Sequence, residues 1–361
     1  MEIYTPEPTQ NYKALIRCFT YNQSLYIEDA LNGFALQQTD FPFVCLVMDD
    51  CSTDGEQDVI KTWMESECDM DKAEYVEIDS SHIILVPHKI NKSCTFAFYL
   101  LKKNLYGTPF KKELINPWRD RCEYEALCEG DDYWIDPLKL QKQIDFLDAN
   151  PLCTISIGLT KTIYPDGKYT GNQIPSFPQN LKQKFTLEDF CREQFEIGQW
   201  TGHTSTFCFR TNIKRYNDDS MSKYFSRFPY GDICIILCCL LQGNGIFIND
   251  HFSNYRLNSG GFNTNMNANP QIAIAVEYKL IDGMKDFDTF TEFKYHKYIR
   301  YRILRSECII EYLQGNRNGF VFLKPKYFPI VRMQGWKTTI LMILQTAFPK
   351  LYPILKKLIK G

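Results

Sequence analysis

Short apolar runs alternate with amphipathic stretches along the first half of the chain. The apolar runs predict buried strands at 14–19, 43–48, 83–86 and 126–128. Between them, apolar residues at helical spacing predict helices near 25–35, 59–63, 95–103 and 137–148. Strands that are apolar throughout and alternate with helices indicate a parallel sheet with helices on both faces.

The second half of the chain is less regular. Strand-like stretches occur at 154–163 and 203–209, and 233–241 is a strongly apolar helix. Helical spacing continues through most of 271–314. Two polar stretches predict loops, at 170–184 and at 258–269. The second, 258–269, is expected to be a mobile lid or acceptor loop.

Paired acids follow two of the predicted strands, as Asp49-Asp50 and as Glu129-Gly130-Asp131-Asp132. Carboxylates held close together repel each other, and a divalent cation removes that conflict. Carboxylate oxygens suit Mg²⁺ or Mn²⁺, with substrate phosphates completing the shell. Ligands bind beyond the C-terminal ends of parallel strands. The pattern therefore predicts a metal–diphosphate site, with a solvated acidic turn as the alternative.

Two common phosphate-binding motifs are missing from the sequence. No GxGxxG follows the first strand, and no GxxxxGK[ST] occurs anywhere. A Rossmann dinucleotide site and a P-loop are therefore both poorly supported. We expect the phosphates to be held with the help of a metal instead of a glycine-rich loop.

Composition narrows the class of protein further. The 361 residues suffice for one large α/β domain or two smaller ones. The net charge of −2 disfavours a general nucleic-acid binder. The 14 cysteines form no C-x-x-C pair, which disfavours a structural zinc site. The N-terminal sequence has no signal-peptide pattern, so we expect a reducing cytosol.

The C-terminal end is apolar and basic. Its uncharged stretch, 338–348, is about half of the ~20 residues needed to span a bilayer. A basic amphipathic segment can instead lie in the membrane interface. We therefore expect 336–361 to make peripheral membrane contact, with an ordinary docked terminal helix as the alternative.

Five segments, in order, resemble motifs of the family 2 glycosyltransferases, which are bacterial inverting enzymes of the GT-A fold. The segments are Thr20-Tyr21-Asn22, the D-D-x-S-T-D-G run Asp49–Gly55, the metal motif and helix Glu129–Gln143, Gly231-Asp232 and Tyr255-Arg256.

The chain also departs from the family pattern. Glu129 stands where the metal motif usually has Asp, and Gly231 stands where a Glu usually precedes the catalytic Asp. The glycine-and-arginine segment is not clear, and Asn91-Lys92-Ser93 is its nearest counterpart. The Q-x-x-R-W signature of processive synthases is absent, which favours transfer of one sugar at a time.

The resemblance implies an α/β fold of GT-A type, with a mostly parallel nucleotide-binding sheet, helices on both faces and a helical C-terminal extension. It implies an enzyme, a hexosyltransferase that moves one sugar from a nucleoside-diphosphate sugar to an acceptor hydroxyl with inversion. A UDP-sugar is the first choice of donor, and a glycan or lipid-linked glycan of cell-surface polysaccharide synthesis is the expected acceptor. Nucleic acid is not an expected partner, and the expected location is the cytoplasm, at the inner face of the plasma membrane.

Residue roles are carried over from the matching motifs. Asp232 would be the general base. The expected nucleotide-sugar contacts are Thr20, Tyr21, Asn22, Asp49, Asp50, Ser52, Asp131 and Arg256, and Asp50 is favoured over Asp49 for the base or ribose. The expected Mn²⁺ or Mg²⁺ ligands are Asp131, Asp132 and Glu129. The acceptor would meet His203 and Trp134.

The expected organisation is a glycosyltransferase domain over 1–257, with a nucleotide-sugar half of about 1–150 and an acceptor half of about 151–257. A mobile loop and helical extension over 258–335 and the basic segment 336–361 would follow. Two other readings remain open. One is a catalytically inactive nucleotide-sugar-binding or interaction protein of the same fold. The other is a sugar-phosphate nucleotidyltransferase, which is disfavoured because 11–24 contains no glycine.

Overall fold

A computed structural model of the chain describes residues 11–352, apart from 79–80, 109, 216–217, 259–263, 265, 267 and 335. The chain divides into two compact units. Unit 1 consists of Met1–Phe185, Gly202–Ile213 and Cys239–Asn258. Unit 2 consists of Thr186–Thr201, Lys214–Cys238 and Ser259–Gly361.

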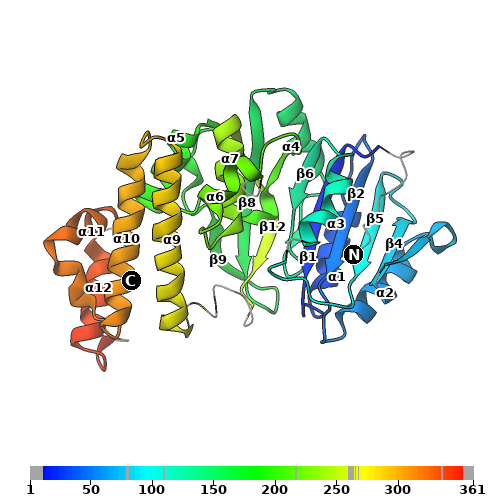
Figure 1. Cartoon of the computed structure of the whole chain (residues 1–361). Helices are drawn as coiled ribbons and strands as arrows, with labels where there is room; N and C mark the ends of the chain where they lie inside the picture. Colours follow the sequence, from blue (N-terminus) through cyan, green and yellow to red (C-terminus); the bar gives the residue numbers. More distant parts are fainter. Residues whose placement is uncertain are drawn as a thin grey trace. The chain divides into compact units, whose positions relative to one another are not determined.

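Unit 1 is built around a 12-stranded mixed sheet with the order β10-β12-β8-β11-β6-β1-β2-β5-β4-β3, in which β7 pairs with β12 and β9 with β8 (Figure 1). The central strands β6, β1, β2 and β5 are parallel, and so are β8 and β12. The strands are β1 (Ala14–Thr20), β2 (Phe43–Asp49), β3 (Glu74–Ile78), β4 (Ser81–Pro87), β5 (Cys94–Leu100), β6 (Tyr124–Leu127), β7 (Tyr133–Trp134), β8 (Cys153–Ile163), β9 (Tyr169–Ile174), β10 (Lys184–Phe185), β11 (Cys208–Arg210) and β12 (Asn244–Arg256).

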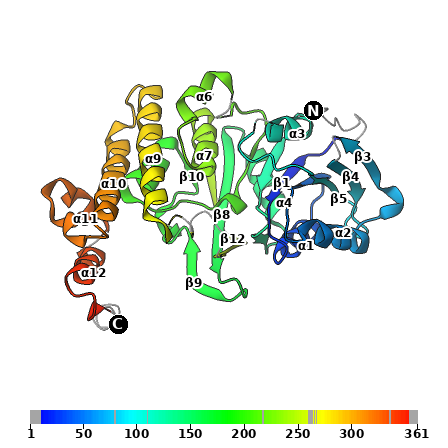
Figure 2. The ribbon, with the colours of Figure 1, turned by 60° about the horizontal axis from the view of Figure 1, so that its bottom comes forward.

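Helices cover both faces of the central strands (Figure 2). On one face, α1 (Ile27–Ala35), α2 (Glu56–Glu67) and α4 (Lys139–Asp148) pack apolar side chains against Ile16 and Cys45. On the other face, α3 (Phe110–Arg119) packs Trp118 against Leu15 and Val44. Alternate residues of β1 and β2 enter the two cores, which is why these strands are mostly apolar. The predicted α/β class is confirmed.

The helix predicted over 95–103 is wrong, because 95–100 belong to the strand β5 and 101–103 are not helical. All seven residues of β5 are buried. A continuous apolar run has no helical or strand period, so its aromatic and β-branched content is the better guide. The run at 83–86 is a strand, β4, but it is antiparallel to β5 and lies outside the parallel block.

Two expectations for the second half of the sheet are also corrected. The predicted loop 170–184 contains β9, which pairs with β8 as an antiparallel hairpin strand. The predicted strand 203–209 begins as a 3-10 turn, η4 (Thr204–Thr206), and only its end enters β11. The predicted loop 258–269 lies largely outside the described residues.

Unit 2 is mainly helical. Helices α9 (Pro270–Phe290) and α10 (His296–Gln314) lie side by side (Figure 1), which confirms the helices predicted over 271–314. Asn269 caps α9 by accepting hydrogen bonds from two backbone N–H groups, and Pro270 is its first residue. The other elements are α5 (Leu187–Phe190), η3 (Cys191–Ile197), α6 (Asp219–Phe225), the first part of α7 (Gly231–Gln242), η5 (Gly319–Leu323), η6 (Pro325–Tyr327), α11 (Phe328–Gln334) and α12 (Trp336–Ala347).

Candidate active site

The order of the strands reverses beside β1. Strands β2 and β5 follow on one side of β1, whereas β6 lies on its other side. Crevices at such a reversal, beyond the C-terminal ends of parallel strands, are the usual ligand sites of α/β sheets. The loops that follow β1, β2 and β6 meet this edge, and they carry most of the candidate residues.

The loops after β1 and β6 touch at Gly130. The Gly130 backbone N–H donates to the Phe19 carbonyl at 3.2 Å. A Cβ at Gly130 would lie 2.3 Å from Thr20 Oγ1 and 2.6 Å from Gln23 Oε1. Glycine is therefore required for this close approach, and it brings Asp131 beside the Thr20-Tyr21-Asn22 segment.

The loops after β1 and β2 are joined through Glu56, the first residue of α2. Its buried carboxylate accepts hydrogen bonds from the Thr20 hydroxyl, from the Gln23 N–H at 2.9 Å and from the Ser52 hydroxyl at 2.8 Å. The Ser52 oxygen in turn accepts the Asn22 N–H at 2.9 Å. Burial raises the pKa of Glu56 above its usual value.

We expect Glu56→Ala to lower the free energy of unfolding by about 3 kcal/mol, because the buried Thr20 hydroxyl and the partly buried donors of Gln23 and Ser52 lose their acceptor. Urea unfolding measures the change. Glu65→Ala is the matched control, since Glu65 lies on the same helix and is exposed. Equal losses in the two variants would show that Glu56 does not join the loops.

Asp49, at the end of β2, is fully buried. Its Oδ1 accepts the Ser52 N–H at 3.1 Å and the Gln57 side-chain amide at 2.5 Å. Its Oδ2 is buried and has no hydrogen-bond partner among the described residues. Asp49 therefore shapes the loop after β2 and retains one acceptor oxygen without a partner.

Asp50 is also buried, and both of its carboxylate oxygens have partners. Oδ1 accepts the Leu105 N–H at 2.6 Å, and Oδ2 pairs with the Lys111 ammonium at 2.7 Å. The Asn104 side chain donates to the Asp50 carbonyl at 3.0 Å. A ligand that bonds to the Asp50 carboxylate would have to share it with these groups.

The three acids of the metal motif differ in exposure. Glu129 is exposed, Asp131 is partly buried and Asp132 is only 2% exposed. Asn258 donates its side-chain amide to Asp131 Oδ2. Burial raises the pKa of Asp131, and it raises the pKa of Asp132 well above the usual value, with the neighbouring Asp131 charge adding to the rise.

Asp131 and Asp132 are oxygen ligands of the kind that bind a divalent cation, and a substrate would complete the coordination shell. Within the described ranges, no group of three or more His, Cys, Asp or Glu side chains is arranged to hold a metal ion. Two neighbouring carboxylates whose pKa values are raised by burial are nevertheless a pair that a cation would stabilise. Because Mg²⁺ commonly uses one or two carboxylates plus phosphate oxygens and water, two protein ligands suffice.

Arg256, at the end of β12, is 4% exposed and is held in a defined position. Its guanidinium carbon lies 4.4 Å from the centre of the Tyr26 ring and 5.4 Å from that of Tyr133. One terminal nitrogen pairs with Asp29 at 2.7 Å, and the backbone N–H donates to Asp132 Oδ1 at 3.0 Å. The buried Nε has no hydrogen-bond partner among the described residues. The guanidinium is thus preorganised and keeps a donor to offer.

The two residues predicted to meet the acceptor lie in the core of unit 1. Trp134 is 2% exposed, and its indole N–H donates to the Ser205 carbonyl at 2.7 Å. His203 is also buried, within 2.8 Å of the Ser205 hydroxyl and 3.5 Å of Asp132 Oδ2. Burial lowers the pKa of His203 to about 3, so the ring is neutral. These contacts give both side chains packing and positioning roles rather than surfaces for an acceptor.

Asp232, the predicted base, lies in unit 2, whereas the other candidate residues lie in unit 1. It occupies the first turn of α7, and its Oδ1 accepts the Ile233 N–H at 2.7 Å. Burial raises the pKa of Asp232. It also raises the pKa of the nearby Tyr230 to about 12. The environment is one that strengthens a carboxylate as a base.

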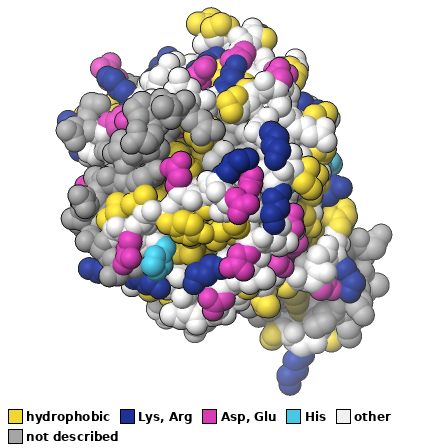
Figure 3. Space-filling model, turned by 90° about the vertical axis from the view of Figure 1, so that its right-hand side faces the viewer, with side chains coloured by type: hydrophobic (Ala, Val, Ile, Leu, Met, Phe, Trp, Pro, Cys, Tyr) yellow, Lys and Arg dark blue, Asp and Glu magenta, His cyan; other side chains and the backbone are white. Residues whose placement is uncertain are grey.

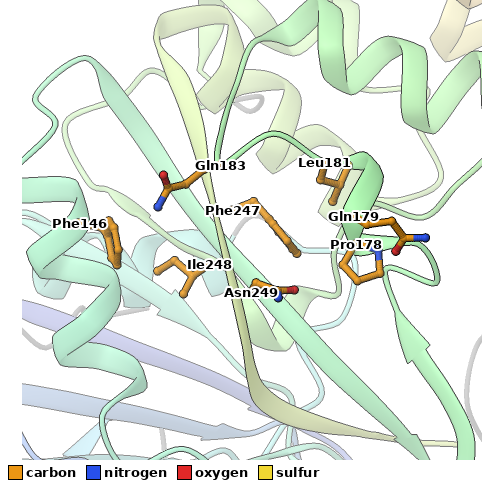
Figure 4. A pocket seen from close by; sticks show the side chains of 8 residues that line it. All are labelled: Phe146, Pro178, Gln179, Leu181, Gln183, Phe247, Ile248 and Asn249. Atoms are coloured by element: carbon orange, nitrogen blue, oxygen red, sulfur yellow. The ribbon is translucent and has the colours of Figure 1, made fainter.

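One cavity of unit 1 contains none of the predicted site residues. It has a volume of about 420 Å³ and is lined by residues of α4, β12 and the segment before β10 (Figure 4): Phe146, Pro178, Gln179, Leu181, Gln183, Phe247, Ile248 and Asn249. Its lining combines apolar rings with amides and carries no charge, so it lacks the groups that bind a metal or a diphosphate.

Several residues that build the site were not predicted from the sequence: Asp29, Glu56, Asn104, Lys111 and Asn258. Glu56 directly follows the D-D-x-S-T-D-G run, so its position could have drawn attention. The others are ordinary polar residues in loops and helices, and only the fold brings them to the acids and to Arg256.

No protein-family model matches the chain. Uncharacterized protein Rv1520 of Mycobacterium tuberculosis and Uncharacterized protein Mb1547 of Mycobacterium bovis are each 36% identical to it over 148 residues. This match covers 41% of the chain and 35% of each relative, so the chain spans about a third of the length of the curated relatives it matches.

Among solved structures, residues 1–349 of S. aureus TarS in complex with UDP have 16% identity and a TM-score of 0.46, and the match covers 95% of this chain and 86% of that 1–349 chain. The mannosyltransferase PcManGT of Pyrobaculum calidifontis, in complex with GDP-Man and Mn²⁺, has 13% identity and a TM-score of 0.44, covering 97% and 90%. Solved glycosyltransferases are therefore among the structures this chain is similar to, and at these scores the likeness assigns neither a family nor a substrate.

Proposed function

We propose that the chain is an inverting, metal-dependent glycosyltransferase that moves one sugar from a nucleoside-diphosphate sugar to an acceptor hydroxyl. One observation carries the proposal. Beyond the C-terminal end of β6, Asp131 is partly accessible, and the neighbouring Asp132 carboxylate accepts the backbone N–H of Arg256, whose guanidinium is preorganised by Asp29 and two tyrosine rings. Carboxylates for a cation and a guanidinium for phosphate together suit a metal diphosphate.

The donor would bind as follows. Asp131 and Asp132, with the exposed Glu129 beside them, would hold Mn²⁺ or Mg²⁺, which neutralises charge on a leaving diphosphate. Arg256 would donate its free Nε–H to a phosphate oxygen. Tyr21 and Asn22 are exposed on the loop after β1, between the residues Thr20 and Gln23 that lie close to Gly130, and would contact the nucleoside.

Asp49 and Asp50 would form the base and ribose side of the pocket. Asp49 offers its unpartnered Oδ2, and Asp50 acts through its ion pair with Lys111. Both are buried, so a small rearrangement of the loop after β2 would accompany donor binding. A UDP-sugar is the donor we propose to try first.

Transfer requires a base for the acceptor, and we propose Asp232. It would take the proton of the acceptor hydroxyl as that oxygen bonds to the anomeric carbon and the bond to the diphosphate oxygen breaks. One base and no covalent intermediate are needed for inversion. A glycan or lipid-linked glycan is the acceptor class we propose, handled in the cytoplasm.

We expect Arg256→Gln to weaken binding of the UDP–Mn²⁺ complex about 10–100-fold, because a charge-assisted hydrogen bond to phosphate is lost. Isothermal titration calorimetry measures the affinity. Arg256→Lys should recover only part of it, since lysine keeps the charge without the planar fork. A melting curve confirms that each variant is folded.

Arg300→Gln is the matched control, because Arg300 also lies over a tyrosine ring, at 5.3 Å from that of Tyr301, but is exposed in unit 2. Unchanged affinity in a folded Arg256→Gln protein would remove Arg256 from the donor site. Absence of any nucleotide binding by the wild type would contradict the proposed function itself.

A further inference from the structure

The charge of the chain is unevenly distributed at its C-terminal end. After Glu311, the last 50 residues contain nine Lys and Arg and no Asp or Glu. The preceding 311 residues therefore carry 32 basic and 43 acidic residues. The face drawn in Figure 3 shows both signs interspersed, as on an ordinary soluble surface. The C-terminal segment is thus a basic region on an otherwise acidic chain.

The same region exposes large apolar side chains. On α12 and the turn after it, Ile340, Phe348 and Leu351 are 45%, 51% and 52% exposed. Together with Leu344 and Ala347 they recur at the spacing of one helical face. We call these five residues the outer face of α12. The elements just before α12 add three more exposed apolar residues, Phe320, Leu323 and Phe328.

The opposite side of α12 is firmly packed. Leu341 is buried, and Met342 packs against the cluster formed by Cys308, Val321, Phe322, Tyr327 and Val331. The Gly319 N–H donates to the Thr346 hydroxyl at 2.7 Å, and a Cβ at Gly319 would lie 2.3 Å from the Met342 carbonyl oxygen. The helix is therefore held in place, and its outer face is presented outward by a defined structure.

Part of the positive charge is neutralised locally. Lys324 and Lys326 both pair with Glu311, the last acidic residue of the chain. The charge beyond them in the sequence is basic only, with Lys337, Lys350, Lys356, Lys357 and Lys360 following Arg332. Among the described residues, Arg332 on α11 and Lys350 just after α12 are exposed. Basic charge and exposed apolar side chains therefore occur in the same segment of the chain.

We propose that the outer face of α12, with the basic residues that flank this helix in the sequence, docks on the surface of an anionic lipid bilayer. Apolar side chains that enter the acyl boundary, surrounded by Lys and Arg, are the pattern of an interfacial helix. Among the described residues, no helix has the length and apolar character to cross a bilayer. A nucleic acid would use the charge but leave the aliphatic side chains exposed. The inference is independent of the proposed reaction.

Vesicle flotation with the full chain tests the proposal. We expect binding to phosphatidylcholine vesicles that contain about one third phosphatidylglycerol, and about tenfold weaker binding to phosphatidylcholine alone. The triple variant Ile340→Gln/Phe348→Gln/Leu351→Gln should lose at least about tenfold in affinity for the anionic vesicles. Replacing Lys350, Lys356, Lys357 and Lys360 by Gln should weaken binding most at low salt.

The matched control is Ile90→Gln/Leu152→Gln, because these side chains are 81% and 80% exposed in unit 1. It should bind like the wild type. Failure of the wild type to float with anionic vesicles would overturn the proposal. The proposal would also be overturned if the triple variant still floated with anionic vesicles. In that case, binding to a single-stranded RNA that is lost in the lysine variant would identify a site for polyanions.

Discussion

Asp131→Asn is expected to lower metal-dependent release of nucleoside diphosphate about 100-fold or more. Asp131 is more accessible than the neighbouring Asp132, and burial already raises the pKa of Asp131. Asparagine keeps the shape and can still meet Asn258, but it removes the charge that holds a cation. The loss should appear both in turnover and in the affinity for Mn²⁺ measured by calorimetry in the presence of the nucleotide.

Asp136→Asn is the matched control for this experiment. Asp136 belongs to the same acidic segment, but its carboxylate pairs with Lys142 at 2.8 Å and accepts the Leu138 N–H at 2.9 Å. These contacts are structural, so we expect near wild-type turnover. If Asp131→Asn retained both turnover and Mn²⁺ dependence, the metal would have to be held elsewhere.

Asp232→Asn is expected to reduce sugar transfer about 10²–10⁴-fold, the usual effect of removing a general base. Donor affinity should stay the same, because the proposed donor contacts all lie in unit 1. Separate measurements of nucleotide binding and of transfer to an acceptor distinguish the two effects. A merely structural role for Asp232 would lower both together.

The pH profile gives a second test of Asp232. Its pKa is raised by burial, and the carboxylate is the active form of a base. The rate should therefore fall as pH falls through a value above 3.8, the usual pKa of an aspartate. Asp218→Asn is the control, because Asp218 lies at the start of helix α6 in the same unit and accepts the Arg215 N–H at 2.7 Å. Wild-type transfer by Asp232→Asn would refute the base assignment.

The central strands could be predicted because their apolar composition indicates that they are buried. β1, β2 and β6 are mostly apolar, although β1 contains Arg17 and β6 contains Glu125, and each carries an interpretable loop at its C-terminal end. β2 and β5 are both wholly buried, but β2 is followed by an acidic turn, whereas the apolar run of β5 continues into Leu101. β5 was missed because no polar residue marked its end, and an unbroken apolar run has no period that separates strand from helix. β9 was missed because its residues are mostly polar and only Ile174 is buried, so the strand is held by pairing with β8.

The acidic loops of the site were visible in the sequence, whereas the orientation of each side chain was not. Asp131 and Asp132 are adjacent, yet one is partly accessible and the other is buried against the backbone of Arg256. Trp134 was predicted to meet the acceptor, but its indole belongs to the core. Orientation depends on contacts between residues far apart in the chain, and a single sequence does not report those contacts.

The most direct test of the proposed function is a panel of UDP-, GDP- and dTDP-sugars incubated with the protein and either Mn²⁺ or EDTA. Slow hydrolysis of a donor needs no acceptor, so free nucleoside diphosphate is the product to measure. We predict release from one class of donor that Mn²⁺ supports and EDTA abolishes. Release of pyrophosphate would instead indicate a nucleotidyltransferase. No release, together with no binding of any donor by calorimetry, would contradict the proposed function and favour a binding or interaction protein.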